Sequence, residues 1–248
     1  MAEENKSLDL LGIKGLSDSV KLATERCLDG AAAFLSRVCL PALEEFGLAL
    51  RDRVSAWRAR NATKILSAAN DLLNAKQPGT QDKIHPRLVH AVLEEGSWTD
   101  DEVVQSMWAG LLASATSPEG NSDENLIFLN ILKQLSSLQV RALNISVERA
   151  TKFDAGYSLP NAGILLMKAA ELGSALGCSD LQRLDRELDH LRALGLIGYG
   201  PGGGMQAGKD VVDLTPTALA LHLYVRAQGS KLSPVKYWKL QPLGTGAA

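Results

Sequence analysis

Cysteines, aromatic residues and net charge are all scarce in this sequence. The 248 residues include 3 cysteines and 5% aromatic residues, and the formal net charge is −2. Cys27, Cys39 and Cys178 form an odd, widely spaced set without a CxxC pair, which favours reduced, buried thiols over a disulfide framework. The near-zero net charge gives no electrostatic argument for nucleic-acid binding. With so few aromatic residues, Leu, Ala, Val and Ile must build the core.

The sequence also shows neither the pattern of a secretory leader nor that of a membrane span. The start of the sequence has no basic stretch followed by an apolar one, as a signal peptide would. The most apolar early stretch, residues 28–50, is interrupted by four charged residues, whereas a membrane helix needs about 18 apolar residues in succession. We therefore expect a cytoplasmic protein in a reducing compartment.

Hydrophobic residues recur at helical spacing over most of the chain, which predicts a mainly α-helical fold. Breaks rich in Pro, Gly and Ser divide the pattern. The predicted regions are a flexible N-terminus at 1–16, a long-helix N-terminal region at 17–78, a compact helical domain at 84–176, a winged-helix-like unit at 177–228 and a loose C-terminal tail at 229–248.

The middle of the chain is acidic and carries clear helix signals. Residues 81–135 hold 3 Lys or Arg against 9 Asp or Glu. Pro86 suits the first position of a short helix that Gly96 ends. Thr99 and Glu102 have the spacing of a capping box, which predicts that Thr99 caps the next helix. A third helix is expected to turn five residues inward: Leu126, Ile127, Ile131, Leu132 and Leu135.

The last third adds short strands to the helices. Residues 138–152 and 160–176 have helical periodicity, and Asp180 is placed to cap the helix that follows. Two short apolar segments, 197–199 and 211–214, flank a glycine-rich stretch. Helix, strand, glycine-rich turn, strand and a further helix are the pattern of a winged-helix-like unit with a small two-stranded hairpin.

No residue pattern indicates catalysis, a cofactor or a metal. Residues 203–210 match most of a phosphate-binding loop, but Asp210 stands where that loop needs a hydroxyl, and a β-branched strand follows instead of a helix. The four histidines are scattered without metal-ligand spacing. We therefore expect a non-enzymatic protein with no catalytic residue, cofactor, metal or small-molecule substrate.

A basic stripe that includes one indole is the best candidate for partner or nucleic-acid contacts. Four of its members follow helical steps of four, three and four residues. Such a stripe is compatible with phosphate contacts. Basic stripes more often face solvent or an acidic protein surface, and residues 94–102 of this chain supply such a surface. The candidates are Arg53, Trp57, Arg58, Arg60 and Lys64.

Helix-packing segments recur along residues 45–228 in an order and spacing shared with one family. They are Trp57–Ile65, Pro86–Leu93, Asp100–Val103 with Met107–Ala113, Ile131–Leu135, Leu194–Ile197 and Leu214–Leu219. In these segments the chain resembles the abortive-infection alpha (Abi-alpha) proteins of bacteria. The resemblance implies a role in defence against bacteriophage, by limiting phage propagation within the infected cell. It carries over no active-site residue.

The expected function joins this resemblance to the missing catalytic pattern. We expect a non-enzymatic component of an abortive-infection-like antiviral defence that acts through protein–protein contacts, as a sensor or adaptor or as an effector. Its expected partner is a protein encoded nearby, a second copy of the chain, or both. The alternatives are a winged-helix nucleic-acid-binding or regulatory protein, and an effector held at a membrane surface by residues 20–50, where Ala- and Leu-rich turns suit an interface.

Overall fold

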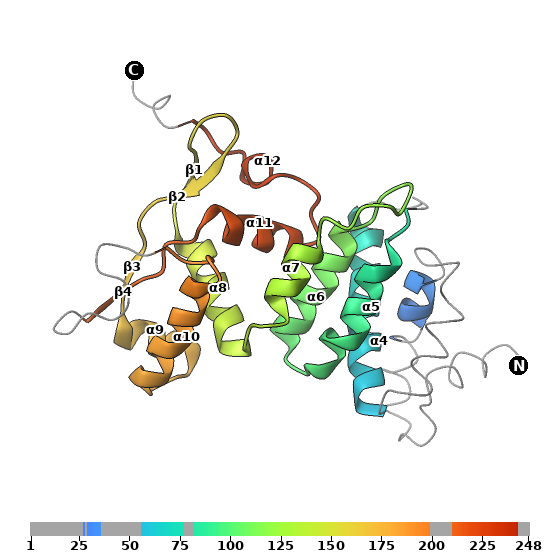
Figure 1. Ribbon diagram of the computed structural model, residues 1–248, viewed down its shortest axis with the longest axis horizontal. Coiled ribbons are helices and arrows are strands. Elements are labelled where there is room, and N and C mark those ends of the chain that lie inside the picture. Colours follow the sequence, from blue (N-terminus) through green and yellow to red (C-terminus); the bar gives the residue numbers. More distant parts are fainter. Residues whose placement is uncertain (1–26, 28, 36–55, 77–81, 199–209, 243–248) are drawn as a thin grey trace, which may run out of the picture. The chain divides into compact units, whose positions relative to one another are not determined.

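Helices dominate the described part of the chain (Figure 1). The computed structural model describes residues 27, 29–35, 56–76, 82–198 and 210–242. Within these ranges the only sheets are two short antiparallel strand pairs. The predicted mainly α fold is therefore confirmed. No helix among the described residues has both the length and the apolar content needed to cross a membrane.

The chain divides into two compact units. Unit 1 contains residues 1–133 and 227–230, and unit 2 contains residues 134–226 and 231–248. The boundary falls inside residues 84–176, which the sequence pattern groups as one helical domain.

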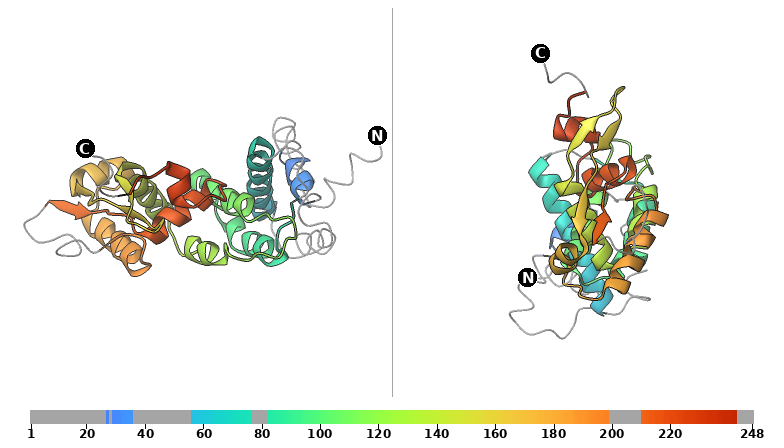
Figure 2. Two further views of the ribbon diagram at one scale, coloured as in Figure 1. Left: turned by 90° about the horizontal axis from the view of Figure 1, so that it is seen from above. Right: turned by 90° about the vertical axis from the view of Figure 1, so that its left-hand side faces the viewer.

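Helix α6 is the central element of unit 1. The unit contains α4 (Ala56–Lys76), α5 (Pro86–Glu94), the 3₁₀ turn η2 (Gly96–Trp98), α6 (Glu102–Ser114) and α7 (Leu126–Leu132). Residues 107–114 of α6 are all buried, because α4, α5 and α7 pack around them. A further helical stretch, residues 29–35, lies beside α4 (Figure 2), where a side chain added at Gly30 would collide with Ser67.

The start of α6 corrects one prediction. Thr99 is not its cap. The N-cap is Asp101, whose carboxylate accepts hydrogen bonds from the amides of Val103 and Val104 at 3.0 and 3.2 Å. Thr99 Oγ1 accepts instead from the Asp101 amide at 3.3 Å. An ionised carboxylate is the stronger acceptor, and its charge also suits the positive end of the helix dipole.

The shorter helices α5 and α7 show one success and one error. Helix α5 begins at Pro86, as predicted, and His85 is its N-cap. In α7 the inward placement of Ile127 is wrong, because this side chain is 52% exposed. The helix has 7 residues, and its buried face is set by Phe128 and Leu132, which lie four residues apart on one side.

Unit 2 combines helices with the short strands. Its elements are α8 (Ser137–Arg149), β1 (Lys152–Asp154), β2 (Pro160–Ala162), β3 (Leu166–Lys168), α9 (Ala169–Leu176), α10 (Leu181–Ala193), β4 (Val211–Asp213), α11 (Ala218–Ala227, of which residues 218–226 fall in this unit) and α12 (Pro234–Trp238). Asp180 caps α10, as predicted, by accepting from two backbone amides. Leu184, Leu188 and Leu191 of α10 are fully buried. Helix α12 lies inside the region predicted as a loose tail.

The helix predicted over residues 160–176 is wrong for its first half. Strands β1 and β2 pair as an antiparallel hairpin, with Phe153 opposite Asn161. Strand β3 follows, and α9 begins only at Ala169. Pro160 has no amide proton and fits the start of a strand better than the inside of a helix. The partner of β3 is β4, far along the chain, and no local periodicity indicates that pairing.

Strand β4 forms where a strand was predicted, with a partner that was not. Within the described residues it pairs antiparallel with β3, so that Met167 lies opposite Val212. Ile197 makes an isolated bridge with Pro216. The rest of the predicted partner strand and the glycine-rich stretch, residues 199–209, lie outside the described residues.

Candidate functional site

The described members of the predicted basic stripe lie on α4, but they do not share one surface. Arg53 is outside the described residues. Arg58 is 9% exposed and faces the interior of unit 1. Arg60 is half-buried and Lys64 is exposed. The structure therefore separates Arg58 from the surface cations.

Arg58 joins α4 to the turn that follows α5. Its Nε donates a hydrogen bond to Ser97 Oγ at 3.0 Å. Its Nη2 donates to the carbonyl oxygens of Leu93 and Glu94 at 3.2 and 3.1 Å. Its guanidinium carbon lies 4.2 Å from the ring centroid of Trp98, within cation–π distance. The basic stripe thus meets the acidic middle region, through bonds that end on a hydroxyl and backbone carbonyls.

The turn η2 is held by further buried contacts. Asn61 Nδ2 donates to the carbonyl oxygen of Ser97 at 3.1 Å, and Ser97 Oγ donates to the carbonyl oxygen of Leu93 at 2.7 Å. Gly96 has little room for a side chain, since a Cβ there would lie 3.0 Å from the ring of Trp108. Satisfied buried networks of this kind rigidify the backbone around them. The backbone that carries Trp98 is therefore fixed.

Trp57 and Trp98 present two indole rings at the surface of unit 1. The two side chains are 36% and 61% exposed. Their ring centroids lie 6.4 Å apart, with the planes tilted by 53°. Exposed tryptophans on a rigid support are typical of the few residues that dominate the energy of a protein interface. We call this pair the indole patch.

The charged residues on both sides of Trp98 in the sequence are acidic, not basic. The exposed acidic side chains are Glu94, Glu95, Asp100 and Glu102. Indole rings beside carboxylates suit a ligand that combines positive charge with an aliphatic stem, as Lys and Arg side chains do. Sequence reasoning found Trp57 but missed Trp98, because no local pattern shows that an indole in the acidic region would meet α4.

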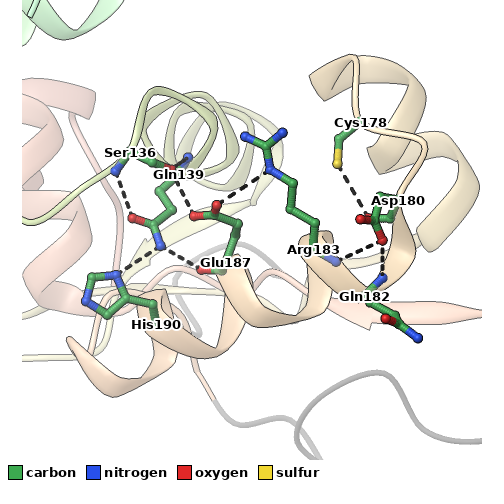
Figure 3. Close-up of polar contacts among 8 residues, drawn as sticks. All are labelled: Ser136, Gln139, Cys178, Asp180, Gln182, Arg183, Glu187 and His190. Carbon is green, nitrogen blue, oxygen red and sulfur yellow. Dashed lines mark hydrogen bonds and ion pairs between the residues drawn. The ribbon is translucent and has the colours of Figure 1, made fainter.

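A second polar cluster joins α8 to α10 in unit 2 (Figure 3). Ser136 Oγ donates to the Glu187 carboxylate at 2.9 Å. Gln139 Nε2 donates to the Glu187 carbonyl oxygen at 3.1 Å and lies 2.9 Å from His190 Nδ1. Ser136 and Gln139 also form the capping box of α8. In this cluster the histidine contacts Gln139 and not the serine, so the serine and the histidine form no nucleophile–base pair. The contacts of the cluster instead fix α8 against α10.

Helix α10 carries both exposed and buried arginines. Gln182, Arg183 and Arg186 are exposed on its outer face. Arg192 is only 3% exposed. Its Nη1 donates to Asp189 Oδ1 at 2.7 Å, while its Nε and Nη2 are buried without a hydrogen-bond partner.

Potential metal ligands are dispersed among the described residues, and the two described cysteines are free thiols. In that part of the chain, no group of three or more His, Cys, Asp or Glu side chains is placed to hold a metal ion. Cys178 is a buried free thiol and Cys27 a half-buried one. Cys39 and residues 203–209 of the glycine-rich stretch lie outside the described residues.

Comparison with known proteins identifies one family. The family model for abortive infection alpha matches residues 60–245, well over half of the chain. The match runs from α4 through α12 and so covers both units. No curated protein and no solved structure matches the sequence. The chain belongs to the abortive infection alpha family.

Proposed function

We propose that this chain is a non-enzymatic component of a bacterial anti-phage defence that acts by binding a partner protein. Its family makes it a protein related to abortive infection. The observation that supports the binding role is the indole patch on η2 and α4. Because buried bonds from Arg58 and Asn61 already fix η2, covering the patch orders little further backbone. A preorganised aromatic surface therefore retains more of its binding free energy.

The charges around the patch favour a basic partner segment. An Arg or Lys of the partner would place its methylenes against the two indoles and its charge near the exposed carboxylates of residues 94–102. Opposite charges across an interface speed association and exclude wrong partners. The partner is a protein encoded nearby, and the chain serves with it as a sensor or adaptor or as an effector.

Plaque assays test the partner requirement. We expect cells that carry this gene with its operon neighbour to reduce plaque formation, and cells that carry this gene alone to give normal plaque numbers. Full protection by the isolated gene would show that the partner version is wrong. An effector is further expected to arrest growth when both genes are induced without phage, whereas a sensor is not.

Substitution of the patch tests the surface itself. Trp98→Ala is expected to abolish protection and to weaken binding of the purified neighbour protein at least tenfold, with native circular dichroism retained. Ile127→Ala is the matched control, because Ile127 is another apolar side chain of unit 1 with comparable exposure, 52% against 61%. Equal protection by wild type and Trp98→Ala would remove the indole patch from the mechanism.

A second candidate, nucleic-acid binding by unit 2, is favoured by the order of its elements. After α8 and the β1–β2 hairpin come a strand (β3), two helices (α9 and α10) and a strand (β4) that returns to pair with β3. Apart from the inserted hairpin, the order is helix, strand, two helices and strand. Winged-helix domains have this order, and they place the second helix of the inner pair in the major groove. That helix is α10 here, and it exposes Gln182, Arg183 and Arg186.

A gel-shift assay distinguishes the two candidates. Nucleic-acid binding predicts a shift that weakens steeply with salt and disappears in Arg183→Glu/Arg186→Glu. The control is Lys83→Glu/Lys133→Glu, two exposed lysines of unit 1 with the same total change in charge. A shift that both variants reduce equally would indicate nonspecific attraction, and no shift at low salt would exclude this function.

A further inference from the structure

One stretch of unit 2 has no charged residue and exposes unusually many apolar side chains. Residues 155–167 contain no Asp, Glu, Lys or Arg. Within them Tyr157 is 101% exposed, and Leu159, Ile164 and Leu166 are 60%, 74% and 57% exposed. Large apolar side chains that are this exposed are a common feature of interaction surfaces.

The first two of these side chains lie at the tip of the β1–β2 hairpin. Gly156, Tyr157 and Ser158 all have positive φ, at 103°, 55° and 59°. The turn is closed by local bonds: Asp154 accepts from the Gly156 amide at 2.9 Å, and the Ala155 amide donates to Leu159 O at 2.8 Å. Left-handed backbone at non-glycine residues is costly, and such positions gather at functional sites. The turn therefore holds the Tyr157 ring outward instead of folding it back.

Helix α12 is fixed beside this hairpin (Figure 1). The amide of Asp154 donates to Gln241 O at 3.1 Å. Trp238 of α12 stacks on Tyr224 at a centroid distance of 6.0 Å, and Lys152 Nζ lies 5.3 Å from the Trp238 ring. We call hairpin β1–β2 together with α12 the hairpin end.

Lysines outnumber acidic residues at the hairpin end and in the residues next to it. Residues 150–168 and 229–242 together contain five lysines and a single acidic residue, Asp154, which is buried. Lys152 is turned inward, where it donates to the Ala150 carbonyl oxygen at 2.8 Å. The exposed lysines of the hairpin end are Lys236 and Lys239, and Lys168 of β3 is exposed as well. One exposed carboxylate adjoins them: Glu148 of α8 accepts from the Tyr224 hydroxyl at 3.1 Å, beside Trp238. The uncharged apolar tip is thus accompanied by more exposed lysines than exposed carboxylates.

We propose that the hairpin end docks on an anionic lipid surface, with Tyr157 and Leu159 in the interfacial layer and the lysines at the headgroups. A tyrosine suits this layer because its ring is apolar and its hydroxyl remains hydrated. Lysines near the surface add attraction to anionic lipid that salt screens. A fully exposed, convex tip favours lipid over an acidic protein, since a fluid interface adapts to the tip and a protein would need a matching pocket.

Vesicle sedimentation with the full chain tests this proposal. We expect the chain to sediment with vesicles of phosphatidylglycerol and phosphatidylcholine, and at least tenfold less with phosphatidylcholine alone. Tyr157→Ser/Leu159→Ser and Lys236→Glu/Lys239→Glu should each weaken binding at least tenfold. The matched controls are Leu181→Ser, an exposed leucine of α10, and Lys83→Glu/Lys133→Glu, two exposed lysines of unit 1. Both controls should bind as wild type does.

Three results would overturn the assignment. Absence of binding to the anionic vesicles would leave the surface to an acidic protein. If the hairpin variants bind as tightly as the wild type, another segment, such as residues 20–50, makes the contact with lipid. An equal loss in Lys83→Glu/Lys133→Glu would indicate attraction by net charge alone, and an equal loss in Leu181→Ser would indicate an effect of any exposed apolar side chain. A Tyr157→Trp variant gives a second measurement: its added fluorescence should shift to shorter wavelength with anionic vesicles, and an unchanged spectrum contradicts insertion.

Discussion

Arg58 and Arg192 are both buried, but their guanidinium groups are satisfied to different degrees. Arg58 donates three hydrogen bonds from two nitrogens and lies against an indole ring. Arg192 has one carboxylate partner, and two of its nitrogens are buried without an acceptor. Burying a donor without an acceptor is costly, whereas removing a satisfied charge leaves its partners unpaired.

We therefore predict that the same substitution changes the free energy of unfolding differently at the two positions. Arg58→Met should lower the free energy of unfolding by about 3 kcal/mol, because carbonyl oxygens at the end of α5 lose their donor. Arg192→Met should change it by less than about 1 kcal/mol or raise it. Urea unfolding followed by circular dichroism measures both. Equal losses at the two positions would contradict the difference in satisfaction.

His222 makes stability depend on pH. Burial, and then the charge of Arg226, lower the pKa of its imidazole below the ordinary value of 6.5. The unfolded chain therefore takes up this proton more readily than the folded one. The contribution is fully present above pH 6.5 and is lost as the pH falls from there through the lowered folded pKa. His222→Gln should flatten the fall in urea midpoint between about pH 7.5 and pH 5.

The wild-type chain, unfolded in urea at the same pH values, is the reference for this measurement. If His222→Gln and the wild type lose stability in parallel on acidification, another group causes the loss.

At the scale of single elements, the start of α6 provides the sharpest test. The Asp101 carboxylate accepts from two amides of the first turn. The Thr99 hydroxyl accepts from the amide of Asp101 itself, which lies before the helix. Asp101→Ala should lower the free energy of unfolding by about 1 kcal/mol, and Thr99→Ala by about half of that or less. The measurement is urea unfolding of both variants at pH 7. A larger loss for Thr99→Ala would restore the capping box that the sequence predicts.

The same element shows what sequence patterns can and cannot predict. Helices with a proline or a carboxylate at the start and a clear apolar face, such as α5 and α10, follow from local chemistry. The choice between Thr99 and Asp101 as the cap does not, because both fit and lie two residues apart. Strands β2 and β3 show no clear alternation because each has only 3 residues. Strand β3 also depends on β4, which lies far along the chain.

The candidate site follows the same division. The sequence pointed to Trp57 and to contact between α4 and the acidic region. It could not show that Arg58 turns inward or that Trp98 completes a surface pair, since both depend on how η2 packs against α4. Local patterns identify residue types and helix faces, while tertiary packing decides which of them remain at the surface.

At the scale of the whole chain, the two units have cores of their own. The buried side chains of α6 anchor unit 1, and the buried leucines of α10 anchor unit 2. The tryptophans are distributed so that each unit can be followed alone: Trp57, Trp98 and Trp108 belong to unit 1, and Trp238 belongs to unit 2. Separate cores predict that a local destabilisation stays within its own unit.

Fluorescence unfolding in urea tests this prediction with matched reporters. Trp238→Phe leaves only unit 1 visible, and a Trp57→Phe/Trp98→Phe/Trp108→Phe chain leaves only unit 2 visible. In the second background, Asp180→Ala should lower the midpoint because the cap of α10 is lost, at about 1 kcal/mol. In the first background the same substitution should leave the midpoint unchanged.

Arg58→Met is the reciprocal test. It should lower the midpoint of the first background, and in the second background it should leave the midpoint reported by Trp238 unchanged. If either substitution moves both transitions equally, the units unfold as one cooperative body, and the division of the chain describes its contacts but not its stability.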